Sequence, residues 1–92
     1  MKYDIKRTGT FKRDQKLMKK RNMNLELLDE VIDKLANGET LPEKNCDHAL
    51  TGNWAGCREC HIEPDWLLVY RREEGKLILV LMRTGSHSDL RF

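Results

Sequence analysis

The chain has 92 residues and a mass of 10.8 kDa, so we expect residues 1–92 to form a single domain with one modest hydrophobic core. Hydrophobic residues make up 39% and charged residues 35%, which is too apolar for a disordered chain. No apolar run reaches the roughly 18 to 20 residues of a membrane span, and no signal peptide opens the chain. We therefore expect a cytoplasmic protein without membrane contact, whose three cysteines stay reduced.

The net charge of +2 hides a strong asymmetry along the chain. Residues 1–21 carry nine basic and two acidic side chains, a net charge of +7, whereas residues 22–44 carry a net charge of −4. A local excess of this size favours a polyanion or an acidic protein as the partner of the N-terminal segment. A solvated helix face is the alternative interpretation.

The N-terminal third predicts one strand and one basic helix. Residues 2–6 alternate in character and place Tyr3 and Ile5 on one side of a short strand. Thr10 is a suitable N-cap for a helix from about 11 to 21, in which lysines surround a narrow apolar stripe.

A second helix follows, and Asn22 and Asn24 are placed to cap it. Apolar residues recur at helical spacing in this segment: Leu25, Leu28, Ile32 and Leu35. Gly38 suits the position after the last helical residue, and Pro42 prevents the helix from continuing.

The C-terminal half predicts three strands, over 57–62, 66–72 and 76–83. Pro64 and Asp65 form the first turn. If Glu74-Gly75 is a two-residue hairpin turn, Trp66 lies directly opposite Arg83.

The fold class that follows is α+β, with the element order βααβββ. We expect a twisted antiparallel four-stranded sheet with the two N-terminal helices packed on one face. The polar strand ends and the loops between them are the places where a site would form.

The most conspicuous local motif is Cys57-Arg58-Glu59-Cys60-His61, which matches the C-x-x-C-H signature of c-type haem attachment. We reject haem because the motif lies inside a predicted strand and no export signal is present. A zinc site is a stronger alternative than haem attachment, with candidate ligands Cys46, His48, Cys57, Cys60 and His61. In an extended strand, however, Cys60 and Ile62 face the core while Cys57, Glu59 and His61 share the other face. We therefore expect no metal ligand and no cofactor.

Polar residues cluster where the predicted strands begin and end, and antiparallel pairing would bring them together: His48, His61, Asp65, Arg83 and His87. Each histidine taken alone is more often a surface or satisfied polar residue than a catalytic one. As a group, the set suits RNA cleavage without a metal. Histidine can take the proton of the attacking 2′-hydroxyl or supply one to the 5′-oxygen, and arginine can hold two phosphate oxygens.

Three sequence strings resemble the YafQ branch of the RelE toxin superfamily. They are Asp47-His48-Ala49-Leu50-Thr51-Gly52-Asn53-Trp54-Ala55-Gly56-Cys57-Arg58, His61-Ile62-Glu63-Pro64-Asp65-Trp66-Leu67-Leu68-Val69-Tyr70 and Arg83-Thr84-Gly85-Ser86-His87. The resemblance implies the toxin of a type II toxin–antitoxin pair, a ribosome-dependent endoribonuclease that cuts mRNA in the A site. It also implies a cognate antitoxin as a partner, besides the ribosome and mRNA.

By matching position, the resemblance implies an active site of His48, His61, Asp65, Arg83 and His87. His87 would be the general acid, Arg83 would stabilise the transition state, and His48, His61 or Asp65 would act as base or orienting group. Trp66 would shape the pocket or stack in it. Family members tend to have a phenylalanine four places after the histidine, but here Arg91 occupies that place and Phe92 follows it. A stacking role for Phe92 and a purely structural role therefore both stay open.

The basic helix is expected to bind ribosomal RNA, the antitoxin or both through Lys12, Lys16 and Lys19. Two other functions remain as alternatives. One is a ParE-like toxin that binds gyrase without nuclease activity, and the other is a zinc-dependent nucleic-acid-binding module.

Overall fold

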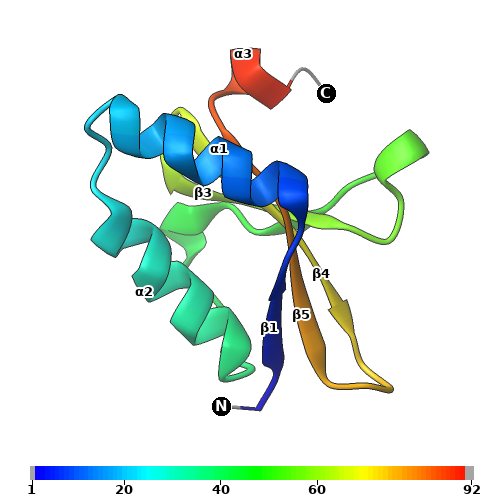
Figure 1. The fold of residues 1–92 in the computed structure, drawn as a ribbon. Coiled ribbons are helices and arrows are strands. Elements are labelled where there is room, and N and C mark those ends of the chain that lie inside the picture. The colour runs from blue at the N-terminus through cyan, green and yellow to red at the C-terminus, as the bar shows by residue number, and fades with distance from the viewer. Residues whose placement is uncertain (1, 91–92) are drawn as a thin grey trace.

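The computed structural model describes residues 2–90, which form a five-stranded mixed sheet with α1 and α2 on one face (Figure 1). The strands follow the spatial order β1-β5-β4-β3-β2. In chain order the elements are β1 (Asp4–Arg7), α1 (Gly9–Lys20), α2 (Leu25–Ala36), η1 (Glu43–Asn45), β2 (His48–Ala49), η2 (Gly52–Trp54), β3 (Arg58–Glu63), β4 (Trp66–Glu73), β5 (Ile78–Gly85) and α3 (His87–Leu90). No helix in this part of the chain is long and apolar enough to cross a membrane.

The α+β class and the two N-terminal helices are confirmed, but the sheet differs from the prediction in two ways. β1 pairs with β5 in parallel, so the sheet is mixed, and His48–Ala49 adds a fifth strand at the β3 edge. The prediction of an all-antiparallel sheet was wrong because hairpin connections fix direction only for strands that follow one another along the chain. β1 reaches β5 through both helices and three strands, so no hairpin sets its direction.

Both long helices begin at a side-chain cap. Thr8, not Thr10, is the N-cap of α1, and its hydroxyl accepts a hydrogen bond from the N–H of Phe11 at 3.0 Å. The backbone of Thr8 is still extended, which is what an N-cap residue requires. Asn24 caps α2 as predicted, by accepting from the N–H of Glu26 at 3.1 Å. Gly38 follows α2 with a positive φ of 79°.

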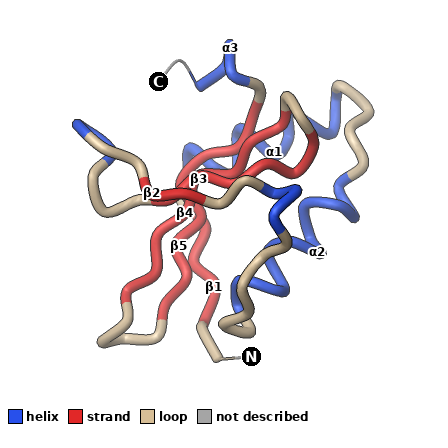
Figure 2. Tube along the Cα trace, turned by 180° about the vertical axis from the view of Figure 1, so that it is seen from behind, coloured by secondary structure: helices blue, strands red, loops and turns tan. Residues whose placement is uncertain are grey.

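The main core lies between the helices and the sheet, and Figure 2 shows α1 and α2 on the same side of the strands. Cys60 is buried in this core and Ile62 packs against it, as the strand alternation predicted. A smaller cluster on the other face contains Cys57, Leu67 and Val69. Cys57 and Cys60 therefore point to opposite faces, which confirms the argument against their sharing one zinc ion.

The hairpin between β4 and β5 is longer than a two-residue turn. Glu73 pairs with Ile78, so four residues, 74–77, connect the strands. A bulge then shifts the register again between Val69 and Tyr70, and Arg83 pairs with Val69. The expected pairing of Trp66 with Arg83 is wrong for these two reasons together.

A buried polar chain joins the start of β4 to the end of β5. The indole Nε1–H of Trp66 donates to Oγ1 of Thr84 at 2.9 Å, and the Thr84 hydroxyl donates to the carbonyl oxygen of Leu67 at 2.7 Å. Both side chains are buried, so neither group has solvent as an alternative partner.

We predict that Thr84→Val lowers the free energy of unfolding by about 1–3 kcal/mol. Valine keeps the shape of threonine but leaves the indole N–H of Trp66 without its hydrogen-bond acceptor. Urea denaturation with an unchanged m-value would measure the loss. In a Trp66→Phe background the same substitution should cost less, because no indole N–H remains to be stranded. Strictly additive losses in the double mutant would contradict the prediction.

Candidate active site

One row of side chains crosses the sheet on the face away from α1 and α2. His48 pairs with Glu59, Glu59 with Val69, and Val69 with Arg83. Directly opposed residues in antiparallel strands share a face, so His48, Glu59 and Arg83 lie on the same side. His61 lies two residues after Glu59 on β3, in the next row on that face. The sheet therefore gathers groups that are separated by 35 residues of chain between His48 and Arg83.

Glu59 lies between two of the three histidines. Its carboxylate is 3.8 Å from Nε2 of His48 and 3.9 Å from Nε2 of His61. These distances exceed direct hydrogen bonds, and the contacts are electrostatic or bridged by solvent. Only 8% of the Glu59 side chain is exposed, so the carboxylate is held beneath the two rings. The sequence interpretation placed Glu59 on this face without including it in the site; its position two residues before His61 was the available signal.

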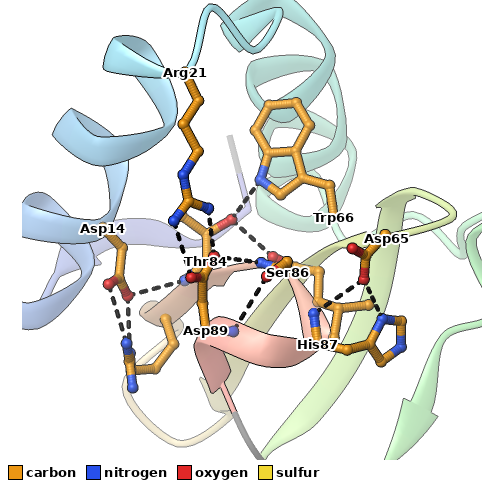
Figure 3. Close-up of polar contacts among 10 residues, drawn as sticks. Asp14, Arg21, Asp65, Trp66, Thr84, Ser86, His87 and Asp89 are labelled. Carbon is orange, nitrogen blue, oxygen red and sulfur yellow. Dashed lines mark hydrogen bonds and ion pairs between the residues drawn. The ribbon is translucent and has the colours of Figure 1, made fainter.

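His87 is the third histidine. It contacts Asp65, which lies in the turn between β3 and β4. One Asp65 oxygen contacts both the ring Nδ1 of His87 at 2.5 Å and its backbone N–H at 3.1 Å (Figure 3). A carboxylate only accepts, so Nδ1 carries the proton of this bond and Nε2 is left to face solvent. The His87 ring also meets His61 edge to face, with 5.6 Å between ring centroids.

The hydrogen bonds from His87 change the acidity of Asp65. The side-chain bond, followed by the backbone bond, lowers the pKa of the Asp65 carboxyl below its ordinary value. The carboxylate therefore stays ionised over the whole neutral range and keeps the imidazole in one orientation. A continuous polar line therefore contains five residues: His48, Glu59, His61, His87 and Asp65.

Arg83 shares this face but is held from α1. Its Nε donates to Asp14 at 2.8 Å and its Nη2 at 3.1 Å, in the two-pronged geometry of a guanidinium–carboxylate pair. The bond to Asp14 raises the pKa of Arg83, so its charge is permanent. Asp14 also accepts the backbone N–H of Thr84 at 3.2 Å, which fixes β5 where β1 no longer covers its edge. Arg83 therefore contacts Asp14 and not the histidines.

Trp66 does not have the predicted stacking position. It is 1% exposed and its indole lies in the core that α1 and α2 cover, so no base can stack on it. Its contribution is to support Thr84 from beneath, one residue after Arg83. Phe92 lies outside the described residues.

The basic residues of α1 lie apart from the histidines. A groove of about 320 Å³ runs along the helical layer and is lined by Lys12, Gln15, Lys16, Lys19 and Leu25. The structure therefore supplies a basic surface on the helical layer and does not place these lysines among the catalytic candidates. A second hollow, of about 450 Å³, adjoins the site itself, and its wall consists of Lys44, Asn45, Cys46, His61, Ile62, Glu63 and Pro64.

We predict that the carboxyl of Asp65 titrates below its ordinary pKa, and that His87→Ala raises this pKa only part of the way back. The reason is that the substitution removes the ring bond and keeps the backbone N–H bond. Carboxyl carbon NMR against pH measures both values.

The sign for stability follows from the same bonds. A carboxyl whose pKa is lowered by folding stabilises the fold above its ordinary pKa, and this contribution is lost as the pH falls through the lowered value. His48→Ala is the matched control, because the imidazole of His48 faces Glu59 and should leave Asp65 unchanged. An Asp65 titration that is identical with and without the His87 ring would contradict the geometry.

Comparison with known proteins places this arrangement in a family. The sequence model of the family described as the bacterial toxin of type II toxin–antitoxin systems, YafQ, matches residues 3–92. The mRNA interferase toxin YafQ of Escherichia coli strain K12 is 38% identical over 88 residues, which cover 95% of this chain and 94% of that protein.

Solved structures agree over nearly the whole chain. The toxin in the E. coli DinJ–YafQ toxin–antitoxin complex superposes with a TM-score of 0.87 at 36% identity, covering 98% of each chain. A metal-bound toxin from Helicobacter pylori superposes with a TM-score of 0.90 at 40% identity, covering 96% of this chain and 98% of that one. Within residues 2–90, no three His, Cys, Asp or Glu side chains are grouped to hold a metal ion. The chain belongs to the YafQ family of bacterial toxins of type II toxin–antitoxin systems.

Proposed function

We propose that this toxin is an endoribonuclease that cuts mRNA in the ribosomal A site by histidine acid–base catalysis without a metal. The observation that carries the proposal is the line of three imidazoles and two carboxylates on one sheet face, with Arg83 on the same face. The relative from E. coli is named an mRNA interferase, which supports the same reaction class.

The reaction is a transfer of the phosphoryl group within the RNA. A base removes the proton from a 2′-hydroxyl, and the 2′-oxygen attacks the adjacent phosphorus. The bond from phosphorus to the 5′-oxygen breaks, and an acid donates a proton to that oxygen. The products are a 2′,3′-cyclic phosphate and a 5′-hydroxyl. Each well-placed proton-transfer group contributes about 10²- to 10⁴-fold to the rate.

His87 fits the role of general acid. Asp65 holds Nδ1, so Nε2 points outward from a ring whose side chain is 58% exposed. In the protonated ring, Asp65 stabilises the charge and Nε2 presents the transferable proton, as the carboxylate of a catalytic triad orients its histidine. Asp65 is then the orienting group and not the base.

The base is one of the two imidazoles that flank Glu59. The ring of His61 lies against that of His87, so a scissile phosphate between or beside them is within reach of both. The buried carboxylate of Glu59 stabilises the imidazolium that forms when either His48 or His61 takes the 2′-hydroxyl proton.

Arg83 supplies the fixed positive charge for the phosphorane-like transition state. Two of its donors go to Asp14, which orients the guanidinium before substrate arrives, and the planar group has further N–H donors for phosphate oxygens. The hollow of about 450 Å³ that shares His61 offers space for a neighbouring nucleotide of the mRNA.

The partners follow from the family and from charge. An antitoxin is the cognate partner by analogy with the DinJ–YafQ complex, and the ribosome with its mRNA is the site of action, which makes the location cytoplasmic. The basic groove of Lys12, Lys16 and Lys19 faces away from the histidines and suits ribosomal RNA or an acidic antitoxin segment.

We predict that His87→Ala lowers the rate of mRNA cleavage by about 10²- to 10⁴-fold, because the leaving oxygen loses its proton donor. Primer extension on mRNA after brief expression should show cuts in register with the reading frame for the wild type and none for the variant. Lys76→Ala, in the exposed turn between β4 and β5, is the control and should cut normally.

The same experiment separates this function from gyrase inhibition. A toxin that acts on gyrase needs no proton-transfer groups, so His87→Ala would remain toxic. Growth arrest by His87→Ala without any cut mRNA would reject the nuclease.

We further predict that replacing Lys12, Lys16 and Lys19 with alanine raises KM for ribosome-bound mRNA and weakens its dependence on salt, with a smaller effect on kcat. Each lost phosphate contact should reduce the slope of log affinity against log salt by about 0.7–0.9. Steady-state cleavage at several salt concentrations measures both quantities.

A variant with the same charge change elsewhere is the control: Lys6, Lys34 and Lys76 to alanine. These lysines lie on three other elements of the chain. An equal rise in KM for both triple variants would mean that net charge, and not the groove, is responsible.

A further inference from the structure

The helix that carries His87 is too short to hold itself in place. α3 has four residues, His87–Leu90, and a single turn of helix is unstable without outside contacts. Its position therefore depends on contacts with the rest of the protein, and so does the placement of the His87 ring. The question is which side chain supplies these contacts.

Asp89 is the side chain on which these contacts converge. Its Oδ2 accepts the backbone N–H of Ser86 at 2.9 Å, and its own N–H donates to the Ser86 hydroxyl at 3.1 Å. This reciprocal pair is a capping box, with aspartate in the third position of the helix. It closes the turn in which His87 is the first helical residue.

The same carboxylate is bound from the far end of α1. Nη1 and Nη2 of Arg21 donate to Oδ2 and Oδ1 of Asp89 at 2.6 and 3.0 Å, as Figure 3 shows. These bonds from Arg21, followed by the bond from Ser86, hold the pKa of Asp89 well below its usual range. Arg21 is the C-cap residue of α1, so the clamp joins the long helix directly to the short one.

The end of β5 is shaped to receive Asp89. A Cβ at Gly85 would lie 2.9 Å from the Cβ of Asp89, which is closer than carbon atoms approach without displacement. Glycine at this position therefore lets Asp89 fold back onto the strand. Leu90 completes the attachment by packing into the cluster on the same face as Leu67 and Val69.

We propose that Asp89, clamped by Arg21, is the positioning residue for His87. It fixes α3 at the angle at which both the backbone N–H and the Nδ1 of His87 reach Asp65. Its effect on cleavage rests on the proposed nuclease function, whereas its effect on the ring does not. An exposed ion pair alone contributes little to stability, and the clamp matters here because it sets an orientation.

Helix α1 would then position both ends of the segment 83–89. Asp14 holds Arg83 and the N–H of Thr84, and Arg21 holds Asp89. The apolar side of α1 is anchored in the core through Phe11 and Met18, so both clamps start from a fixed element.

The kinetic test compares Asp89→Asn and Arg21→Ala with the wild type on ribosome-bound mRNA. A displacement of about 1 Å in a catalytic group can cost about 10²-fold in rate, so we expect kcat to fall by about 10- to 100-fold at nearly constant KM. Arg21→Lys keeps the charge and loses the two-pronged geometry, and it should recover part of the loss. Lys20→Ala removes the same charge one residue earlier and should cleave like the wild type.

An NMR test follows the histidines without any substrate. Asp89→Asn and Arg21→Ala should shift the imidazole carbon and proton resonances of His87 and leave those of His48 in place. His48 is the internal control, because it lies beside Glu59 on β2, the edge strand of the sheet beyond β3. If general unfolding shifts the resonances of His48 as well, Arg21→Lys is the deciding variant. Unshifted His87 resonances in Arg21→Lys, together with full kcat, would overturn the proposal.

The two measurements also separate the two proposals. Resonances of His87 that shift in a protein without any nuclease activity would support the positioning role and reject the nuclease. Unchanged resonances together with unchanged kcat in Asp89→Asn would reject the positioning role and leave the nuclease standing.

Discussion

The antiparallel pairing of β2, β3, β4 and β5 is the constraint on which the site depends. Opposed residues of such strands share a face, and α1 and α2 cover one of the two faces. The candidate site lies on the other face. His48, Glu59 and Arg83 come together there because backbone hydrogen bonds fix the register, and the bulge in β4 and β5 decides that Arg83 and not its neighbour points to that side.

Carboxylates contact the three histidines and the arginine of this site. Glu59 faces two imidazoles, Asp65 holds His87, and Asp14 holds Arg83. In the proposed reaction, each carboxylate fixes an orientation before substrate binds, which lowers the reorganisation needed in the transition state. The sequence interpretation concentrated on the groups that exchange protons or carry positive charge, and it recognised Asp65 alone among these acids.

Helix α1 has three roles. Its apolar stripe packs in the core, its lysines line a basic groove, and its polar side holds the C-terminal segment. Loss of packing beneath α1 would therefore disturb the chemistry as well as the stability. The buried hydrogen bond from Trp66 to Thr84 supports the same C-terminal segment from the core side, because Thr84 follows Arg83 directly.

The sequence by itself determined the α+β class, the two amphipathic helices and the opposite faces of Cys57 and Cys60, because these follow from local periodicity. Only the tertiary structure decided the parallel pairing of β1, the longer hairpin and the burial of Trp66. It also decided the partners of the acids, since Asp14 and Asp89 bind arginines that lie 69 and 68 residues away along the chain. Long-range contacts of that kind leave no periodic signal, because their partners are set by packing and register and not by spacing.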